Sequence, residues 1–548
     1  MFLGVPRSGL PTNSPSFLLS FRQMSSHYKT PSEEGVIHSG AETRGGVHNG
    51  TWVLAATILG SSITFIDGTV VNVALPVLQE KLGASVSEVQ WVVESYALML
   101  SALILVGGAL GDKYGRKLIF SIGVAIFAAS SLWCGLVSDI TGLIAARAVQ
   151  GLGAALLVPG SLAIISATFP KKDRARAIGT WSGFTAISAG FGPVLGGWLV
   201  ENISWRWIFF INLPLAAIVL LITWRRVPET RDRDAKEGLD WPGAVLATAG
   251  LGGLVYGLTE FSGRGLSDPM VTGSLILGLA SIAAFVLVEA RIPGPMMPLD
   301  LFRSKTFAGA NLLTLFLYSA LSGMLFFLPF NLIRVQGYSP TVAGSALIPF
   351  VLTMFLLSRW AGGLVDRFGS KIPLVIGPIV TGAGFMLFAL PGSGGSYWTT
   401  FFPAIMVMSI GMTTSVAPLT TTVMGAVNES HAGTASGINN AVSRTAGLMA
   451  VAIFGLVMVA GFDRNLEARI NAPEFPAGAR LLVEEQKDRL VDIDVSAMSP
   501  ETGATATAAV RESFVAGFRL TCFLAAGLAF ASAFFSWLLI DGKNQSKS

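Results

Sequence analysis

The chain has 548 residues, of which 52% are hydrophobic and 13% are charged, with a formal net charge of +4. Soluble domains carry about 25% charged residues, so this sequence lacks the charged surface that a water-soluble protein of this length needs, and lipid must be its outer solvent. The small positive excess gives no support to nucleic-acid binding.

Apolar runs recur along the whole chain, each with about twenty residues or more, the length with which a helix crosses about 30 Å of hydrocarbon. They lie at 52–75, 90–111, 118–137, 141–168, 177–200, 205–224, 241–260, 271–289, 307–332, 341–365, 371–390, 398–424, 433–460 and 514–540. We therefore predict an all-α integral membrane protein with fourteen transmembrane helices. Two cytoplasmic tails are predicted as well, a disordered one over 1–48 that is rich in Ser, Gly and Pro, and a short one over 541–548.

Lysine and arginine gather in every second short loop, which predicts that these loops face the cytoplasm. The loop with Lys113, Arg116 and Lys117 is an example. An even number of spans then puts both termini in the cytoplasm and the chain in the inner (plasma) membrane. The long segment 461–512 faces outward in this arrangement, and its mixed-charge run, Glu484–Asp494, is a candidate for a short surface helix.

An internal repeat is the most informative feature of the sequence. The stretch Gly108–Lys117 is echoed by Gly362–Lys371, an offset of 362 − 108 = 254 residues, and both copies lie in a tight loop between two predicted spans. Two halves that are built alike are what an alternating-access transporter needs to rock around a central site. A receptor or a structural membrane protein has no such requirement.

The positions of the two copies predict the domain organisation. They lie between spans two and three and between spans ten and eleven, so the halves repeat after eight spans. We predict a six-helix bundle over 49–224, two inserted helices with cytoplasmic flanking loops over 225–306, and a second six-helix bundle over 307–540 that includes the outer loop 461–512. The inserted pair is expected to lie outside the transport path.

The repeated loop resembles the signature of the major facilitator superfamily. The candidate latch residues that carry this resemblance are Gly108, Asp112, Gly115, Arg116, Lys117, Asp366 and Gly369. We expect Gly108 to let a helix of the other half pack closely, Asp112 to meet a helix N-terminus, and Arg116 to pair with that carboxylate. Such contacts would hold the cytoplasmic face shut. The alternative is an ordinary basic turn that obeys the charge rule.

Charged residues inside the spans are the candidates for proton coupling. Arg147 opens a stretch, 147–154, that resembles the superfamily motif in which an intramembrane arginine takes part in proton coupling, although an interfacial arginine is the alternative. Asp67 opens a stretch, 67–76, that resembles the first-span motif of the fourteen-span drug:proton antiporters. A carboxylate in a low-dielectric cleft can exchange protons near neutral pH, so Asp67 is the first candidate, against a role in helix packing alone.

Glu94, in the second predicted span, is the second candidate for proton coupling. A position at the outer interface of the membrane is its alternative. For the substrate cavity, Asn72 and Arg444 are the candidates. Arg444 lies in a polar patch that resembles the thirteenth span of this branch, where it could neutralise a buried carboxylate or contact the substrate.

The fifth predicted span is rich in small residues and resembles the motif associated with antiporters. The residues that match it are Gly179, Ser188, Gly192, Pro193, Gly196 and Gly197, with Ser188 in place of a glycine of the family pattern. Small residues allow close helix packing, and Pro193 removes a backbone hydrogen bond and favours a bend. Without the flanking motifs, this span would indicate packing only.

These patterns predict a secondary active transporter that exports amphipathic drugs or metabolites in exchange for protons by alternating access. The alternatives are a proton-coupled symporter or facilitator that imports a nutrient, and a membrane sensor or scaffold. We expect no enzyme activity, no cofactor and no metal, because the sequence has neither a phosphate-binding Gly-rich loop nor a Cys/His ligand spacing. The expected partners are a small-molecule substrate, protons and the lipid bilayer; no residue reports on a periplasmic adaptor.

Overall fold

The computed structural model describes residues 50–542 apart from 232–239, 293–294, 296, 428–431, 474, 492, 495 and 497, and the predicted tail over 1–48 lies outside this part. In the first half of the described chain the helices are α2 (Gly50–Leu82), α3 (Val86–Tyr114), α4 (Arg116–Leu136), α5 (Ile140–Thr168), α6 (Lys171–Asn202), α7 (Trp207–Phe210) and α8 (Asn212–Arg226). The two helices that follow are α9 (Trp241–Arg264) and α10 (Pro269–Glu289).

The second half begins with a 3-10 turn and ends with a long helix. Its elements are η3 (Leu299–Arg303), α11 (Lys305–Phe330), η4 (Asn331–Val335), α12 (Pro340–Ser345), α13 (Ile348–Gly362), α14 (Leu364–Phe368), α15 (Lys371–Phe388), α16 (Phe401–Gly425), α17 (Ala432–Ile470), α18 (Ala477–Glu484), η6 (Lys487–Arg489) and α19 (Pro500–Leu539).

Each of the fourteen predicted spans coincides with one helix or with two or three helices in series. Twelve helices of the described chain are long and apolar enough to cross a membrane, or thirteen if the bent helix α3 counts as one span. The count of fourteen therefore stays a prediction, with α6, which begins with several charged residues, as the helix in question.

Short polar residues define where several helices begin. The Ser85 side chain accepts a hydrogen bond from the backbone N–H of Glu88, whose carboxylate accepts from the Ser85 N–H in return, and this capping box starts α3. Asp139 caps α5 by accepting from the N–H of Gly142 at 2.8 Å. Asp240 caps α9 in the same way.

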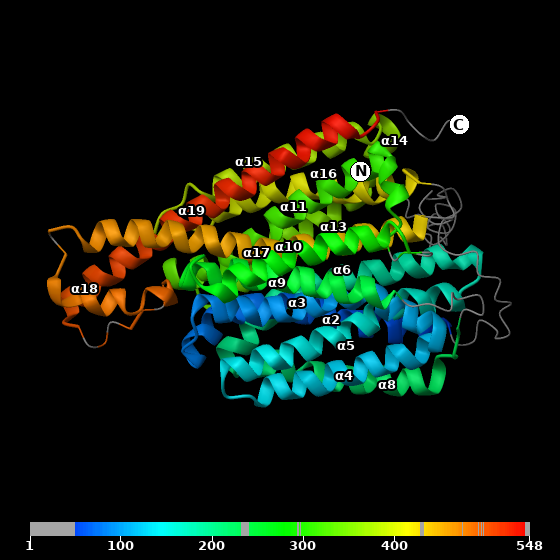
Figure 1. The fold of residues 1–548 in the computed structure, drawn as a ribbon, viewed down its shortest axis with the longest axis horizontal. Helices are drawn as coiled ribbons and strands as arrows, with labels where there is room; N and C mark the ends of the chain where they lie inside the picture. Colours follow the sequence, from blue (N-terminus) through cyan, green and yellow to red (C-terminus); the bar gives the residue numbers. More distant parts are fainter. Residues whose placement is uncertain are drawn as a thin grey trace, which may run out of the picture.

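The helices form two bundles that share an interface (Figure 1). In the first bundle α2 packs on α5, α6 and α8, while α5 also packs on α3 and α4. In the second bundle α11 packs on α17 and α19, and α15 packs on α16 and α19. The interface between the bundles is made where α6 meets α12 and α13, and where α2 meets α11.

The inserted helix α9 lies beside this interface, and the position of the inserted pair outside the transport path stays a prediction. Helix α9 packs on α3 of the first bundle and on α17 of the second, and α10 packs on the outer side of α9. Leu251 and Val255 of α9 form a small apolar cluster with Leu448 of α17. An apolar helix in a membrane can face lipid or a neighbouring helix, and the seam between α3 and α17 gives α9 such a neighbour.

The two ends of the molecule are distinct. Helices α17 and α19 have 39 and 40 residues. At 1.5 Å per residue each is about 60 Å long, twice the hydrocarbon thickness. They extend past the other helices at one end, where α18 also lies (Figure 1). We call this the projection end, and the opposite end, with the loops at Gly115 and Gly369, the signature end.

The structure of the segment 461–512 at the projection end differs from the prediction. The helix proposed over Glu484–Asp494 is wrong, because α18 ends at Glu484 and only a 3-10 turn, Lys487–Arg489, follows. Ala479 and Val483 of α18 are buried, whereas in the mixed-charge run the buried Leu490 has a φ of +52°, a left-handed conformation that does not continue a helix. The surface helix therefore forms over Ala477–Glu484 and not over the charged run.

Candidate functional site

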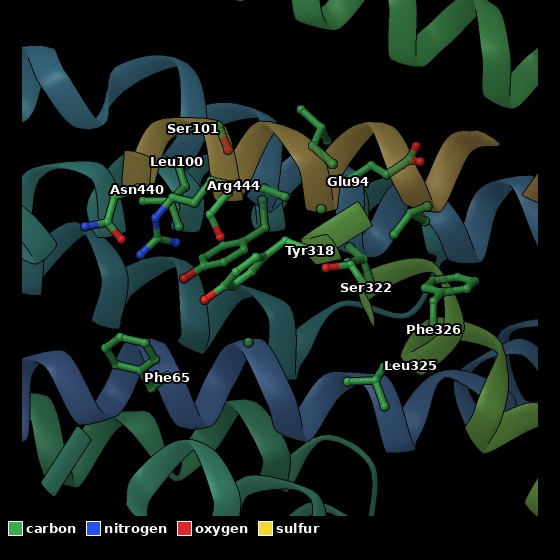
Figure 2. A pocket seen from close by; sticks show the side chains of 18 of the residues that line it. Phe65, Glu94, Leu100, Ser101, Tyr318, Ser322, Leu325, Phe326, Asn440 and Arg444 are labelled. Atoms are coloured by element: carbon green, nitrogen blue, oxygen red, sulfur yellow. The ribbon is translucent and has the colours of Figure 1, made fainter. Parts of the chain in front are cut away.

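A cavity of about 520 Å³ lies between the two bundles, within the usual range of drug-binding sites. Its walls come from α2, α3 and α5 on one side and from α11, α16 and α17 on the other. Asn72, Glu94, Arg147 and Arg444 all line it, so four of the predicted site residues share one cavity. Figure 2 shows Arg444 and Glu94 toward different ends of the cavity, with Tyr318 between them.

Asp67 lies behind the cavity wall in a polar network. Its Oδ2 accepts a hydrogen bond from Arg147 Nη1 at 2.5 Å, and the pair forms a buried salt bridge. Its Oδ1 accepts from Gln150 Nε2 at 2.9 Å and from Asn212 Nδ2 at 3.1 Å. The Ser131 hydroxyl accepts from the same two amides. Asp67 is thus a buried, fully bonded carboxylate, and its predicted role in proton exchange stays a prediction.

Arg147 separates Asp67 from the cavity. Only 1% of its surface is exposed, which rules out the interfacial arginine that was its alternative. Its Nε donates to the carbonyl of Val92 at 3.0 Å, and its guanidinium lies 4.3 Å from the centroid of the Tyr96 ring. Contacts to a carboxylate, a carbonyl and an aromatic face together balance a charge that is expensive inside a membrane.

Glu94 is held differently, although it is also fully buried. Its Oε2 accepts a hydrogen bond from the Thr259 hydroxyl of α9 at 3.0 Å, while its Oε1 has no hydrogen-bond partner in the described part of the protein. Its side chain is thus enclosed by protein, and a position at the depth of the outer interface stays an alternative. Thr259 was not predicted, because it lies on an inserted helix that was expected to lie outside the transport path.

Arg444 presents a charge to the cavity without an opposite charge beside it. The described residues offer its guanidinium neither a hydrogen bond nor an ion pair, and the titratable side chain that faces it is Tyr96. Its neighbour Asn439 is used in packing, because its amide donates to Thr314 at 2.6 Å and to Asn311 at 3.2 Å, both on α11. Arg444 therefore lines the cavity, as predicted, but neutralises no carboxylate there.

The signature loop is built within the first bundle. Arg116 pairs with Asp112 as predicted, with Nε at 2.9 Å from Oδ1. Gly108, however, faces Pro159 of α5 at an ordinary contact distance and not a helix of the other half. The second copy ends α14 at Gly369, where φ is +72°, as Gly115 ends α3 with φ of +122°. The side chain of Asp366 lies outside the described part.

The helix N-terminus at this loop is capped by a residue that was not predicted. The carboxylate of Glu229, which follows α8, accepts from the N–H groups of Lys117 and Leu118 at 3.0 and 3.1 Å. These are orphan donors of the first turn of α4, and a carboxylate there also complements the helix dipole. Asp112 was expected both at such a position and beside Arg116, and among the described contacts it makes only the second. The acidic residue just after a basic helix end was the available signal for Glu229.

The small residues of α6 serve two packing faces. A Cβ at Gly192 or Gly196 would collide with Thr69 or Val70 of α2 in the same bundle, whereas one at Gly197 would collide with the Pro340 carbonyl of α12 in the other bundle. Gly344 of α12 in turn packs closely on the carbonyl of Pro193 in α6. The Ser188 hydroxyl donates to the Ser62 hydroxyl of α2 at 2.8 Å. The surroundings of Gly179 lie outside the described part.

Replacing Gly197 with leucine is expected to separate α6 from α12. Overpacking costs about 1–3 kcal/mol, enough to reduce about tenfold the population of molecules in which α6 and α12 are in contact. Cross-linking of Glu201→Cys with Thr341→Cys measures closure, since the Thr341 N–H donates to the Glu201 carboxylate at 3.0 Å and both native cysteines are buried.

The matched control is Gly273→Leu on α10, where an added Cβ meets nothing within 4 Å. This variant should cross-link like the parent protein. Equal cross-linking of the Gly197→Leu variant would show that the contact at Gly197 does not hold the bundles together.

Further contacts between the bundles lie toward the projection end. Arg334, after α11, donates to the Glu80 carboxylate at 2.6 Å and to the Pro76 carbonyl at 2.8 Å, both on α2. The Gln79 amide donates to the carbonyl of Arg489 in the projection at 3.0 Å. These bonds join the two bundles on the projection side of the cavity.

Comparison with known proteins identifies the family. Residues 57–462 match the Major Facilitator Superfamily. The multidrug resistance protein Stp of Mycobacterium tuberculosis (strain CDC 1551 / Oshkosh) is 36% identical over 423 residues, 76% of this chain and 77% of that protein. The tetracenomycin C resistance and export protein of Streptomyces glaucescens is 29% identical over 504 residues, 91% of this chain and 93% of that protein.

The fold has solved counterparts. The inward-facing and occupied structure of a bacterial homolog to the human lysosomal transporter Spinster covers 90% of this chain and 97% of its own, with a TM-score of 0.64 and 17% identity. At this identity the likeness concerns the fold alone. The family match, the relatives and the helical architecture confirm the resemblance that the signature loops predicted. The protein is a multi-pass membrane transporter and not an enzyme, and it belongs to the major facilitator superfamily.

Proposed function

We propose that this transporter exports amphipathic drugs or metabolites across the cytoplasmic membrane in exchange for protons. The cavity carries the proposal, because it lies between two bundles and is lined by both, as alternating access requires. Relatives whose names denote multidrug resistance and tetracenomycin C export support the direction of transport.

The proposed orientation places the signature end in the cytoplasm, following the basic loops. The contacts of Arg334 with Glu80 and of Gly197 with Pro340 then close the cavity toward the outside. The structure corresponds on this assignment to the state that collects substrate from the cytoplasm. Proton entry from outside would follow once these contacts open.

Two carboxyl groups are proposed to bind and release the transported proton. Glu94 faces the cavity with an unpartnered oxygen, so a proton or a donor group of the substrate can satisfy it, and the two would compete for one site. Asp67 would carry either a proton or the ion pair with Arg147, because protonation removes the charge that holds the guanidinium. The Asp67–Arg147 pair would thereby link proton binding to the cavity wall.

Everted membrane vesicles from cells that produce the protein test this function. Respiration acidifies their lumen, and the signature end faces the medium. We expect rhodamine 123, a cationic dye, or its zwitterionic parent acid rhodamine 110 to enter the lumen and to discharge part of the pH gradient, as followed by an acridine dye.

Vesicles from cells without the protein provide the control. Uptake that is indifferent to the pH gradient would reject proton coupling. Gradient-driven movement of dye from lumen to medium would favour import by symport, and movement of neither dye would overturn drug export.

A further inference from the structure

The cavity contains an unused cationic site. Arg444 is permanently charged at physiological pH, and a guanidinium without a counterion in a membrane interior is expensive. The nearby carboxylates do not balance it: Asp67 is bonded to Arg147, and Glu94 forms no ion pair with Arg444 in the described chain. A ligand is the remaining source of negative charge.

The register of two helices places Arg444 within the cavity. The Gln90 amide of α3 donates to the carbonyl of Val451 on α17 at 3.2 Å, so these two residues lie level. The helices run in opposite directions, and seven residues further toward the signature end are Ala97 and Arg444. Ser101 is one turn beyond Ala97, and Glu94 is about one turn before it, at 1.5 Å per residue.

Uncharged donors accompany the guanidinium. The Ser101 hydroxyl is buried, lines the cavity and has no hydrogen-bond partner in the described chain. Asn440, one turn before Arg444 on α17, also lines the cavity. Figure 2 shows Ser101, Asn440 and Arg444 toward one end of the cavity and Glu94 toward the other. An oxyanion bound at the first end would satisfy donors that the protein leaves open.

The middle of the cavity suits an aromatic frame. Tyr318 lies between the two charged ends (Figure 2), and Tyr96 lines the cavity from α3 between Glu94 and Ser101. Phe65 and Phe326 add apolar wall. Aromatic rings pack against flat ligands by offset or edge-to-face contact. A ligand that spans this region can present one end to Arg444 and the other to Glu94.

We propose that the cavity takes an amphoteric aromatic compound, whose acidic oxygen binds Arg444 and whose cationic or donor end faces Glu94. This inference rests on the proposed export function and names its substrate class. A net-neutral zwitterion also suits antiport, because its cationic end can replace the proton of Glu94 while its anionic end is balanced by Arg444.

Two dyes that differ by one methyl ester test the role of Arg444. Rhodamine 110 has a free carboxylate and a cationic ring system, and rhodamine 123 is its methyl ester. Binding to the purified full-length protein in detergent is measured by fluorescence anisotropy. We expect the parent protein to bind rhodamine 110 at least about tenfold more tightly than rhodamine 123, the scale of one charge-assisted hydrogen-bond pair.

Variants at position 444 separate charge recognition from folding. Arg444→Gln should remove the preference by weakening rhodamine 110 alone, and Arg444→Lys should keep part of it. The control Arg303→Gln removes an exposed guanidinium outside the cavity and should bind both dyes like the parent.

Equal binding of the two dyes by the parent protein would overturn the inference. So would an Arg444→Gln variant that weakens both dyes alike, because that pattern indicates a structural role or an ion pair with Glu94 in another state. The proposed function can fail independently of this inference. An Arg444-dependent preference for rhodamine 110 without proton exchange in vesicles would support the substrate class and reject antiport. Proton exchange without that preference would support antiport and reject the substrate class.

Discussion

Replacing Asp67 with asparagine is expected to abolish gradient-driven dye uptake and to lower the thermal stability of the protein. Asparagine keeps the shape of the side chain but removes the charge that balances Arg147, which is 1% exposed. Removal of one partner from a buried ion pair costs about 3–5 kcal/mol, because the other charge stays buried. Thermal unfolding of the purified protein and dye uptake by everted vesicles are the two measurements.

A double variant distinguishes proton coupling from packing. Asp67→Asn combined with Arg147→Met removes both charges, so most of the stability should return while uptake stays absent. If the double variant takes up dye like the parent, the pair only holds helices together, and Asp67 is not in the proton path.

The control for this series is Asp300→Asn. Asp300 pairs with Arg303 at 3.2 Å, but both side chains are more than four-fifths exposed. Surface pairs contribute about 0–1 kcal/mol, so this variant should keep both the stability and the uptake of the parent. A large loss in Asp300→Asn would mean that the assays respond to any lost acidic side chain.

The helices and the charged centre of the cavity were predictable from the sequence. Apolar runs of membrane length report directly on helices, and charged residues in such runs are rare enough to single out Asp67, Glu94, Arg147 and Arg444. The structure brings Asp67 and Arg147 into contact and places the other two on the same cavity. Which carboxylate is fully bonded and which keeps an unbonded oxygen depends on side-chain geometry, which hydropathy does not encode.

The neutral partners were not predictable for a different reason. Gln150, Asn212 and Thr259 are polar residues of a kind found in most membrane helices, and only helix rotation decides which face a carboxylate. The place of α9 depends on a long-range choice, because an apolar helix can pack on lipid or on any open seam. The repeat of 254 residues indicated an insertion but carried no information on which seam it covers.

Replacing Glu94 with glutamine is expected to remove proton coupling while the cavity still binds dye. Glutamine retains an acceptor for the Thr259 hydroxyl, which lies 3.0 Å from Glu94 Oε2, but it can neither bind nor release a proton near neutral pH. Gradient-driven uptake of rhodamine 123 should fall to the level of vesicles without the protein. Exchange of dye across vesicles without a gradient should continue, because it needs no net proton movement.

Glu260→Gln provides the matched control for Glu94→Gln. Glu260 lies at the projection end of α9, and its carboxylate already accepts from Ser87 at 2.8 Å, from Trp91 at 3.3 Å and from Arg264 at 3.1 Å. It is not among the cavity-lining residues, so its variant should keep gradient-driven uptake. Uptake that survives in Glu94→Gln would exclude this carboxyl group from the proton path. The proton would then have to be carried by the Asp67–Arg147 pair alone.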